Sequence, residues 1–109
     1  MHNNFFSTGA PVFVKLPDVI APVQKEETVK FECIVESFPK PTINWLLNGK
    51  ELTNKDGVQF EKDVANNKYS LTIPKVNSNV HAGTVTIIAK NPIGSVQHDV
   101  TLSVNGAYF

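Results

Sequence analysis

Apolar and polar residues alternate along several short stretches of this chain. The apolar faces of these stretches consist of Val29, Phe31, Cys33 and Val35; Leu71 and Ile73; Val85, Ile87 and Ala89; and Val100, Leu102 and Val104. A period of two with one polar face is typical of antiparallel strands that pack on a single side. Helical periodicity is missing from the sequence, so the pattern predicts a domain built from β-strands.

Turn-forming residues separate the strand-like stretches. Asn48-Gly49, Asp56-Gly57 and Asn66-Asn67 each stand between two of them. Seven runs are predicted to be strands, at residues 11–17, 28–37, 42–47, 58–63, 68–73, 84–90 and 95–104. Short strands at near-regular spacing favour an all-β sandwich or barrel. In the turn after the sixth run, Pro92 is expected to preset φ and Gly94 to adopt a positive φ.

Size and charge limit the range of partners. The chain has 109 residues, with ten lysines, ten carboxylates and no arginine, and this length is typical of a single domain. Nucleic-acid binding favours a surplus of positive charge, and a polybasic membrane patch needs clustered lysine or arginine. No stretch approaches the roughly 20 apolar residues that span a bilayer. We therefore expect neither nucleic acid nor membrane as a partner.

The chain contains a single cysteine, Cys33, so an intramolecular disulfide is impossible. Small secreted domains usually rely on such bridges. None of the eleven asparagines lies in an N-glycosylation sequon. Both observations favour a reducing, cytoplasmic compartment.

Three core positions have a specific spacing. Trp45 follows Cys33 by twelve residues, and Ile87 follows Trp45 by 42. This spacing resembles the Cys…Trp…Cys core of the immunoglobulin fold, with isoleucine in place of the second cysteine. The segments PKPTINWLLNGKEL, KYSLTIPKV and HAGTVTIIAKNPIG are similar to the intermediate set (I-set) of that family. Over roughly residues 11–104 the chain resembles the domains of the titin, twitchin and obscurin group of giant muscle proteins.

The resemblance implies an all-β, immunoglobulin-like β-sandwich of the I-set, with two antiparallel sheets and no disulfide. Residues 1–10 are then linker or added sequence, and residues 105–109 a C-terminal linker. Trp45 is expected to fill the core, and Cys33 to be a small buried hydrophobe instead of a reactive thiol. The predicted core is Val29, Phe31, Cys33, Trp45, Leu71, Ile73, Val85, Ile87, Ala89, Val100 and Leu102.

Three residues depart from the family pattern. His81 stands where the family usually has aspartate, Val85 replaces the tyrosine-corner residue, and Ile87 replaces the second cysteine. The missing tyrosine hydrogen bond costs about 1 kcal/mol, and the missing disulfide about 2–4 kcal/mol. Apolar packing around Ile87 is expected to offset both losses.

No constellation in the sequence predicts catalysis. His2, His81 and His98 do not form a metal-ligand spacing with one another or with Cys33. A Gly-x-Ser-x-Gly motif and a phosphate-binding glycine-rich loop are both missing from the sequence. We therefore expect no catalytic residue, cofactor or metal, and no enzymatic activity in this domain. The resemblance leaves open a separate kinase domain in the parent protein.

Two residues are candidates for contacts with other molecules. Ile93 is expected at the exposed tip of its turn, as a contact for a neighbouring domain or as a lone surface residue. His98 shares a face with Val96 and Val100, which predicts partial burial and either pH sensitivity or a simple edge position. His81 is expected to be solvated in a turn, like the pair Glu26–Glu27.

The resemblance implies a structural, mechanically resistant and protein-binding module of a large intracellular protein of the sarcomere or myofibril. Residues 19–24 would pair in parallel with residues 96–104 and resist shear, while Pro17 and Pro22 interrupt the sheet edge. The expected partners are neighbouring immunoglobulin or fibronectin-type domains and other muscle proteins, and the isolated domain is expected to be monomeric.

Two alternative functions remain open. One is specific protein recognition through an edge strand, with residues 5–13 as a docking arm or as plain linker. The other is an extracellular cell-adhesion domain that has lost its disulfide. Partnered cysteines and sequons in the flanking chain would favour the adhesion domain.

Overall fold

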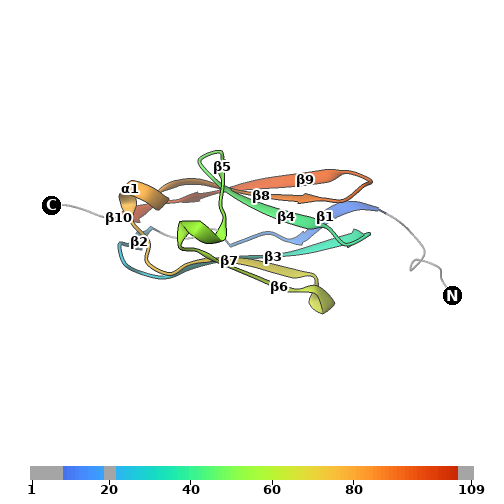
Figure 1. Cartoon of the computed structure of the whole chain (residues 1–109), viewed down its shortest axis with the longest axis horizontal. Helices are drawn as coiled ribbons and strands as arrows, with labels where there is room; N and C mark the ends of the chain where they lie inside the picture. The colour runs from blue at the N-terminus through green and yellow to red at the C-terminus, as the bar shows by residue number, and fades with distance from the viewer. Residues whose placement is uncertain (1–8, 19–21, 106–109) are drawn as a thin grey trace.

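The structure is a computed structural model that describes residues 9–18 and 22–105, and these residues form two stacked β-sheets (Figure 1). The strand order of the first sheet is β1 (Gly9–Lys15), β3 (Val29–Phe38), β7 (Lys68–Ile73) and β6 (Gln59–Asp63). The strand order of the second sheet is β5 (Lys50–Glu51), β4 (Thr42–Leu47), β8 (Gly83–Lys90) and β9 (Ser95–Leu102). All strand pairs within these two sheets are antiparallel. The predicted fold class is therefore confirmed.

A short parallel pair joins the second strand to the last strand of the described chain. β2 (Val23–Gln24) pairs in parallel with β10 (Val104–Asn105). The start of β1 and the strand β10 lie at opposite ends of the sandwich (Figure 1). The remaining elements of the described chain are one helical turn each: η2 (Asn54–Asp56), η3 (Val64–Asn66) and α1 (Ser78–His81).

The strand boundaries differ from the predicted ones at both ends of the domain. β1 begins at Gly9, so the last two residues of the predicted linker belong to a strand, and Asn105 belongs to β10. The rest of both predicted linkers, residues 1–8 and 106–109, lies outside the described residues. Residues 5–8 of the proposed docking arm also lie there, while its residues 9–13 belong to β1. In the described part of the chain, β9 ends at Leu102 and pairs with β8, and the parallel pairing covers Val104 and Asn105. Residues 19–21 of the predicted partner segment lie outside the described residues, so the pairing predicted for residues 96–104 is seen at Val104 and stays a prediction over the rest.

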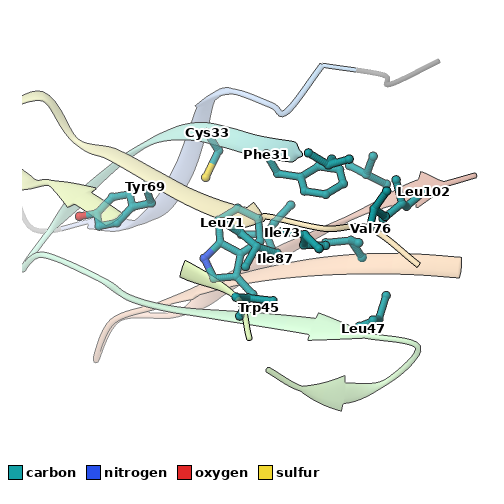
Figure 2. Packing of buried hydrophobic residues seen from close by; sticks show 14 of the residues in the cluster. Phe31, Cys33, Trp45, Leu47, Tyr69, Leu71, Ile73, Val76, Ile87 and Leu102 are labelled. Carbon is teal, nitrogen blue, oxygen red and sulfur yellow. The ribbon is translucent and has the colours of Figure 1, made fainter. Parts of the chain in front are cut away.

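The core lies between the two sheets, and Figure 2 shows its largest side chains. Trp45 is directly opposite Ile87 in the β4–β8 ladder. Cys33 and Ile87 point into the core from opposite sheets, and both are fully buried (Figure 2). All eleven residues of the predicted core are buried. Further buried apolar residues are Val35, Leu47, Val58, Tyr69 and Val76.

Two turns show how local sequence sets the register. Asn48 and Gly49 form the two-residue connection between β4 and β5, with φ values of 52° and 85°. Positive φ at both positions is the hairpin geometry that Asn-Gly adopts at low cost. Gly94 behaves differently from the prediction, since it does not adopt a positive φ. A Cβ atom at Gly94 would lie 3.1 Å from the Cβ of Ala10, so the glycine is explained by the close approach of β1.

Candidate functional site

The buried thiol of Cys33 is not placed for chemistry. The residue is fully buried, and burial raises the pKa of its thiol to about 11, with a smaller contribution from the charge of Glu32. Because the thiolate is the reactive form, the thiol of the folded protein is a poor nucleophile near neutral pH. Cys33 belongs to the buried hydrophobic cluster that also contains Leu71 and Ile87, and its side chain points into the core (Figure 2).

The histidines lie apart, and the prediction for one of them is wrong. His81 is half-buried at the end of α1, where its Nδ1 accepts a hydrogen bond of 2.8 Å from the backbone N–H of Asn77. Burial lowers the pKa of His81. His81 was predicted to be solvated, but its ring accepts a hydrogen bond from Asn77, the residue that caps the start of α1. His2 lies outside the described residues.

His98 is half-buried in β9, as its alternation predicts. Its ring lies edge-on to Phe13 of β1, with the ring centroids 6.3 Å apart at an interplanar angle of 65°. The contact joins β1, an edge strand of the first sheet, to β9, an edge strand of the second sheet. Ile93 lies in the turn between β8 and β9 and is 54% exposed. His98 and Ile93 thus belong to different parts of the surface and form no common site.

No group of three or more potential metal ligands occurs among residues 9–18 and 22–105. Within the same part of the chain, no helix has the length and apolar character required to cross a bilayer. The Glu26–Glu27 pair is exposed in the turn between β2 and β3. Glu27 has a local role there, since its Oε1 accepts a hydrogen bond of 2.7 Å from the backbone N–H of Gln24.

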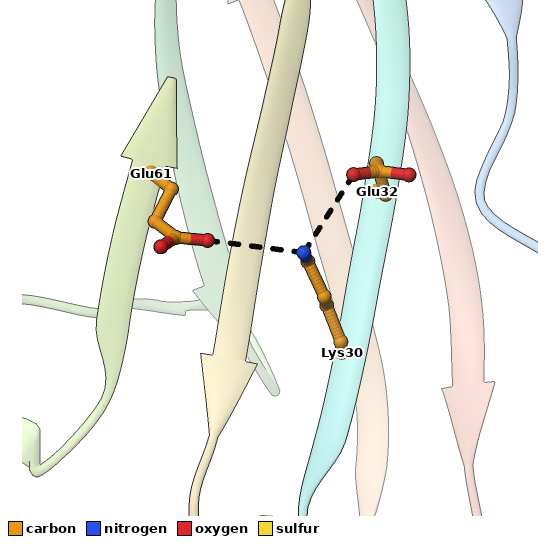
Figure 3. Close-up of polar contacts among 3 residues, drawn as sticks. All are labelled: Lys30, Glu32 and Glu61. Carbon is orange, nitrogen blue, oxygen red and sulfur yellow. Dashed lines mark ion pairs between the residues drawn. The ribbon is translucent and has the colours of Figure 1, made fainter. Parts of the chain in front are cut away.

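An exposed ion-pair network crosses the outer face of the first sheet (Figure 3). Lys30 Nζ lies 3.7 Å from Glu32 Oε2 on the same strand and 3.8 Å from Glu61 Oε1 on β6. All three side chains are solvent-exposed, so water and salt screen the attraction and the pairs stabilise the fold only slightly. The outer face of the first sheet is therefore solvated and carries charges of both signs.

Backbone hydrogen bonds hold the parallel pair β2–β10 and the turn that follows β2. The Val23 N–H donates to the Ser103 carbonyl at 3.0 Å, and the Lys25 N–H donates to the Asn105 carbonyl at 3.2 Å. Two more backbone bonds fix the following turn: Glu26 N–H to the Val76 carbonyl at 2.7 Å and Val76 N–H to the Glu27 carbonyl at 2.9 Å. Residues 23–27 are therefore held on both sides, by the end of the described chain and by the loop after β7.

A polar cluster ties together the opposite end of the sandwich. The Asn91 side-chain amide donates to the Gly9 carbonyl at 2.7 Å, the Ser37 hydroxyl at 2.8 Å and the Pro39 carbonyl at 3.1 Å. Its Oδ1 accepts from the N–H groups of Ile93 and Gly94. Asn91 is buried. This one side chain fixes the start of β1, the β3–β4 turn and the β8–β9 hairpin relative to one another.

Comparison with known proteins identifies relatives from two biological settings. The chain is 36% identical over 80 residues, 73% of its length, to the muscle M-line assembly protein unc-89 of Caenorhabditis elegans, of which it covers 1%. It is 32% identical over 99 residues, 83% of its length, to the cell adhesion molecule Dscam1 of Drosophila melanogaster, of which it covers 5%. The chain thus spans only a small part of the curated relatives that it matches.

The solved structures give a consistent result. The titin domains Z1Z2 in complex with telethonin match with a TM-score of 0.83 and 26% identity, over 93% of this chain and 50% of the titin chain. The model of the immunoglobulin I-set domain matches residues 11–104. This chain is therefore a member of the immunoglobulin I-set family, related both to giant muscle proteins and to cell-adhesion proteins.

Proposed function

We propose that this chain is a load-bearing, protein-binding immunoglobulin module of a large intracellular muscle protein. The observation that carries the proposal is the parallel pairing of β2 with β10 near the end of the domain. The relationship to unc-89 and to titin supports the muscle setting. In this setting we expect the domain to bind neighbouring immunoglobulin or fibronectin-type domains and other proteins of the same filament.

The direction of the strands explains how the pair resists force. β2 and β10 run in the same direction. Tension applied through the start of β1 pulls β2 backward, while tension applied after β10 pulls that strand forward. The two strands are then pulled past each other along their own axes, so the bonds from Val23 to Ser103 and from Lys25 to Asn105 have to break together. Bonds loaded jointly in shear resist more force than bonds that open one at a time.

A substitution at Lys25 tests this proposal with little change in side-chain packing, because Lys25 is exposed. Lys25→Pro removes the N–H that donates to Asn105, whereas Lys25→Ala retains it. In single-molecule pulling, Lys25→Pro is expected to lower the unfolding force and Lys25→Ala to leave it unchanged. The destabilising core variant Val58→Ala controls for a general loss of stability and is expected to change the force less than Lys25→Pro. An unchanged force for Lys25→Pro would refute the proposal.

A second candidate function is protein recognition at the β1 edge. Val12 and Val14 of β1 and Leu16 just after it occupy alternate positions and are 58%, 54% and 43% exposed. Such a row favours the addition of an apolar strand from a partner. Size-exclusion chromatography at several concentrations, together with pull-down from muscle lysate, tests it. A stoichiometric partner that binds the wild-type domain and not the Val14→Lys variant supports recognition at this edge. Equal capture of the partner by the wild-type domain and the variant contradicts it.

An extracellular adhesion role is the third candidate, supported by the relationship to Dscam1. It predicts sequons and cysteine pairs in the adjacent domains of the full-length protein. It also predicts display of the full-length protein at the cell surface. Surface labelling of intact cells separates it from the muscle proposal, which predicts labelling only after permeabilisation.

A further inference from the structure

The hairpin between β4 and β5 carries a chemically reactive pair of residues. Asn48 and Gly49 are its two turn residues (Figure 1). In an Asn-Gly sequence the backbone nitrogen of the glycine can attack the side-chain amide of the asparagine, because glycine has no side chain that hinders the approach. Asn48 is exposed, so water reaches this site in the folded protein. The chain contains one further Asn-Gly sequence, at Asn105 and Gly106.

The reaction of such a pair is deamidation, which consumes water and releases ammonia. The Gly49 nitrogen forms a bond to Cγ of Asn48, the bond from Cγ to Nδ2 breaks, and Nδ2 leaves as ammonia with the proton of the Gly49 N–H. The product is a five-membered succinimide ring. Water then adds to one of the two ring carbonyls and opens the ring, which leaves either aspartate or isoaspartate at position 48.

The backbone of the folded hairpin prevents this ring from closing. Ring closure requires the Cβ atom of Asn48 and the nitrogen of Gly49 to lie on the same side of the Asn48 Cα–C bond. Asn48 has a φ of 52°, and the allowed region for an L-residue at this φ is the left-handed one, with a ψ of about +30 to +60°. At such a ψ the two atoms lie on opposite sides of the bond, so Cγ does not reach the nitrogen.

Three hydrogen bonds to β8 keep Asn48 in this conformation. Its Oδ1 accepts from the Thr84 N–H at 2.9 Å, its Nδ2 donates to the Ala82 carbonyl at 3.0 Å, and its backbone N–H donates to the Thr84 carbonyl at 2.8 Å. β8 is an inner strand of its sheet, paired with β4 on one side and β9 on the other. Ring closure therefore requires the hairpin to detach from β8.

We propose that Asn48 is a deamidation site that reacts only when the hairpin detaches from β8, and that the reaction marks the domain permanently. Aspartate places a carboxylate oxygen where Nδ2 donates to the Ala82 carbonyl, so that two acceptors face each other. Isoaspartate adds a carbon to the main chain of a two-residue turn, and the geometry of such a turn sets the register of its strands. A domain that has unfolded and reacted thus refolds to a less stable state. The site uses neither β2 nor β10, and the proposal is independent of the load-bearing role.

Mass spectrometry tests the protection of Asn48 directly. We suggest incubating the domain at mildly alkaline pH, once folded in buffer and once unfolded in urea, and locating deamidation by peptide mapping. Asn48 is expected to react at least about tenfold more slowly in the folded protein, because the opened form is a small fraction of the molecules. In urea, Asn105 is the reference for an unprotected Asn-Gly sequence and is expected to react at a rate similar to Asn48. Equal rates for Asn48 in the folded and unfolded samples would overturn the proposal.

The effect on refolding is measured by holding the domain in urea for increasing times, refolding it, and recording a urea denaturation curve. The midpoint is expected to fall with the time spent unfolded, in step with the deamidated fraction at Asn48. Asn48→Gly is the matched control, because glycine adopts the positive φ of the turn but has no amide to lose. Its midpoint is lower from the start and is expected to change much less with time. A constant wild-type midpoint, or an equal fall in the Asn48→Gly variant, would refute the permanent mark.

A substitution reproduces one of the two products without any incubation. Asn48→Asp is expected to lower the midpoint of urea denaturation. Asn79→Asp introduces the same charge at an exposed position of α1 and is expected to leave the midpoint unchanged. Equal midpoints for the two variants would contradict the proposed loss of the bond to Ala82.

Discussion

A Cβ atom placed on Gly83 would lie 2.0 Å from the Oδ1 atom of Asn48. This close approach has a structural reason. Asn48 Oδ1 accepts a hydrogen bond of 2.9 Å from the Thr84 N–H, and its amide donates to the Ala82 carbonyl at 3.0 Å. The Asn48 side chain therefore lies across the start of β8, in the space that any side chain at Gly83 would need. Gly83 also has a φ of 136°, which L-residues rarely adopt.

Gly83→Ala is therefore expected to be strongly destabilising. Both the steric conflict and the backbone strain act, so we expect a loss of about 3 kcal/mol or more in the free energy of unfolding. Urea denaturation measures this loss. Gly57→Ala is a matched control, because Gly57 has a φ of 73° but open space around it. Equal losses in the two variants would show that backbone strain alone accounts for the effect.

Removing the Asn91 side chain is expected to loosen the end of the sandwich where β1 begins. Asn91→Ala leaves the N–H groups of Ile93 and Gly94 and the carbonyls of Gly9 and Pro39 without this partner. The expected loss in unfolding free energy is about 2–3 kcal/mol. Hydrogen exchange at Ile93 and Gly94 is expected to accelerate more than exchange in β7. Uniform acceleration over the whole domain would contradict a local role.

The buried thiol of Cys33 predicts a loss of stability at alkaline pH. The pKa of the thiol is 9.0 in the reference state and about 11 in the folded protein. Between these values the unfolded chain releases its proton and the folded protein keeps it, so the free energy of unfolding falls as pH rises. The loss is of the order of 2 kcal/mol. Cys33→Ala is expected to lack this contribution, and an identical alkaline decrease in that variant would refute it.

His81 predicts a separate decrease at mildly acidic pH. Its folded-state pKa is lowered, so below the unfolded value near 6.5 the unfolded chain binds more protons and stability falls. Protonation also removes the lone pair that accepts the Asn77 N–H. We expect His81→Gln to reduce the decrease between pH 6.5 and 5 in acid-dependent urea denaturation. An unchanged decrease in this variant would contradict the role of His81. The carboxyl groups of Asp56 and Asp63, whose pKa values are also lowered, act only at lower pH.

The sequence predicts the centre of the fold well because strand alternation is a local signal. Cys33 and Ile87 lie on the inward positions of their strands, and this alternation alone places them in the core. Trp45 is expected there from its spacing to Cys33 and Ile87 and from the family resemblance that this spacing carries. Val76 has no such signal. It is buried in a loop because its backbone bonds to Glu26 and Glu27 of a distant turn.

Contacts between distant segments explain what the sequence does not predict. The network of Asn91 joins residues 82 positions apart in the chain, and the end of β9 before β10 begins depends on the pairing of each with a different strand. None of these relationships has a periodic pattern in the sequence.

Pulling the unmodified fold in two directions tests the load-bearing role most directly. Force applied through the two chain ends loads β2 and β10 in shear. Force applied between a handle at Lys25 and the C-terminal end separates the same strands from one side, so that their bonds open one after another. We predict a clearly higher unfolding force for the first direction. Equal forces in both directions would contradict the account.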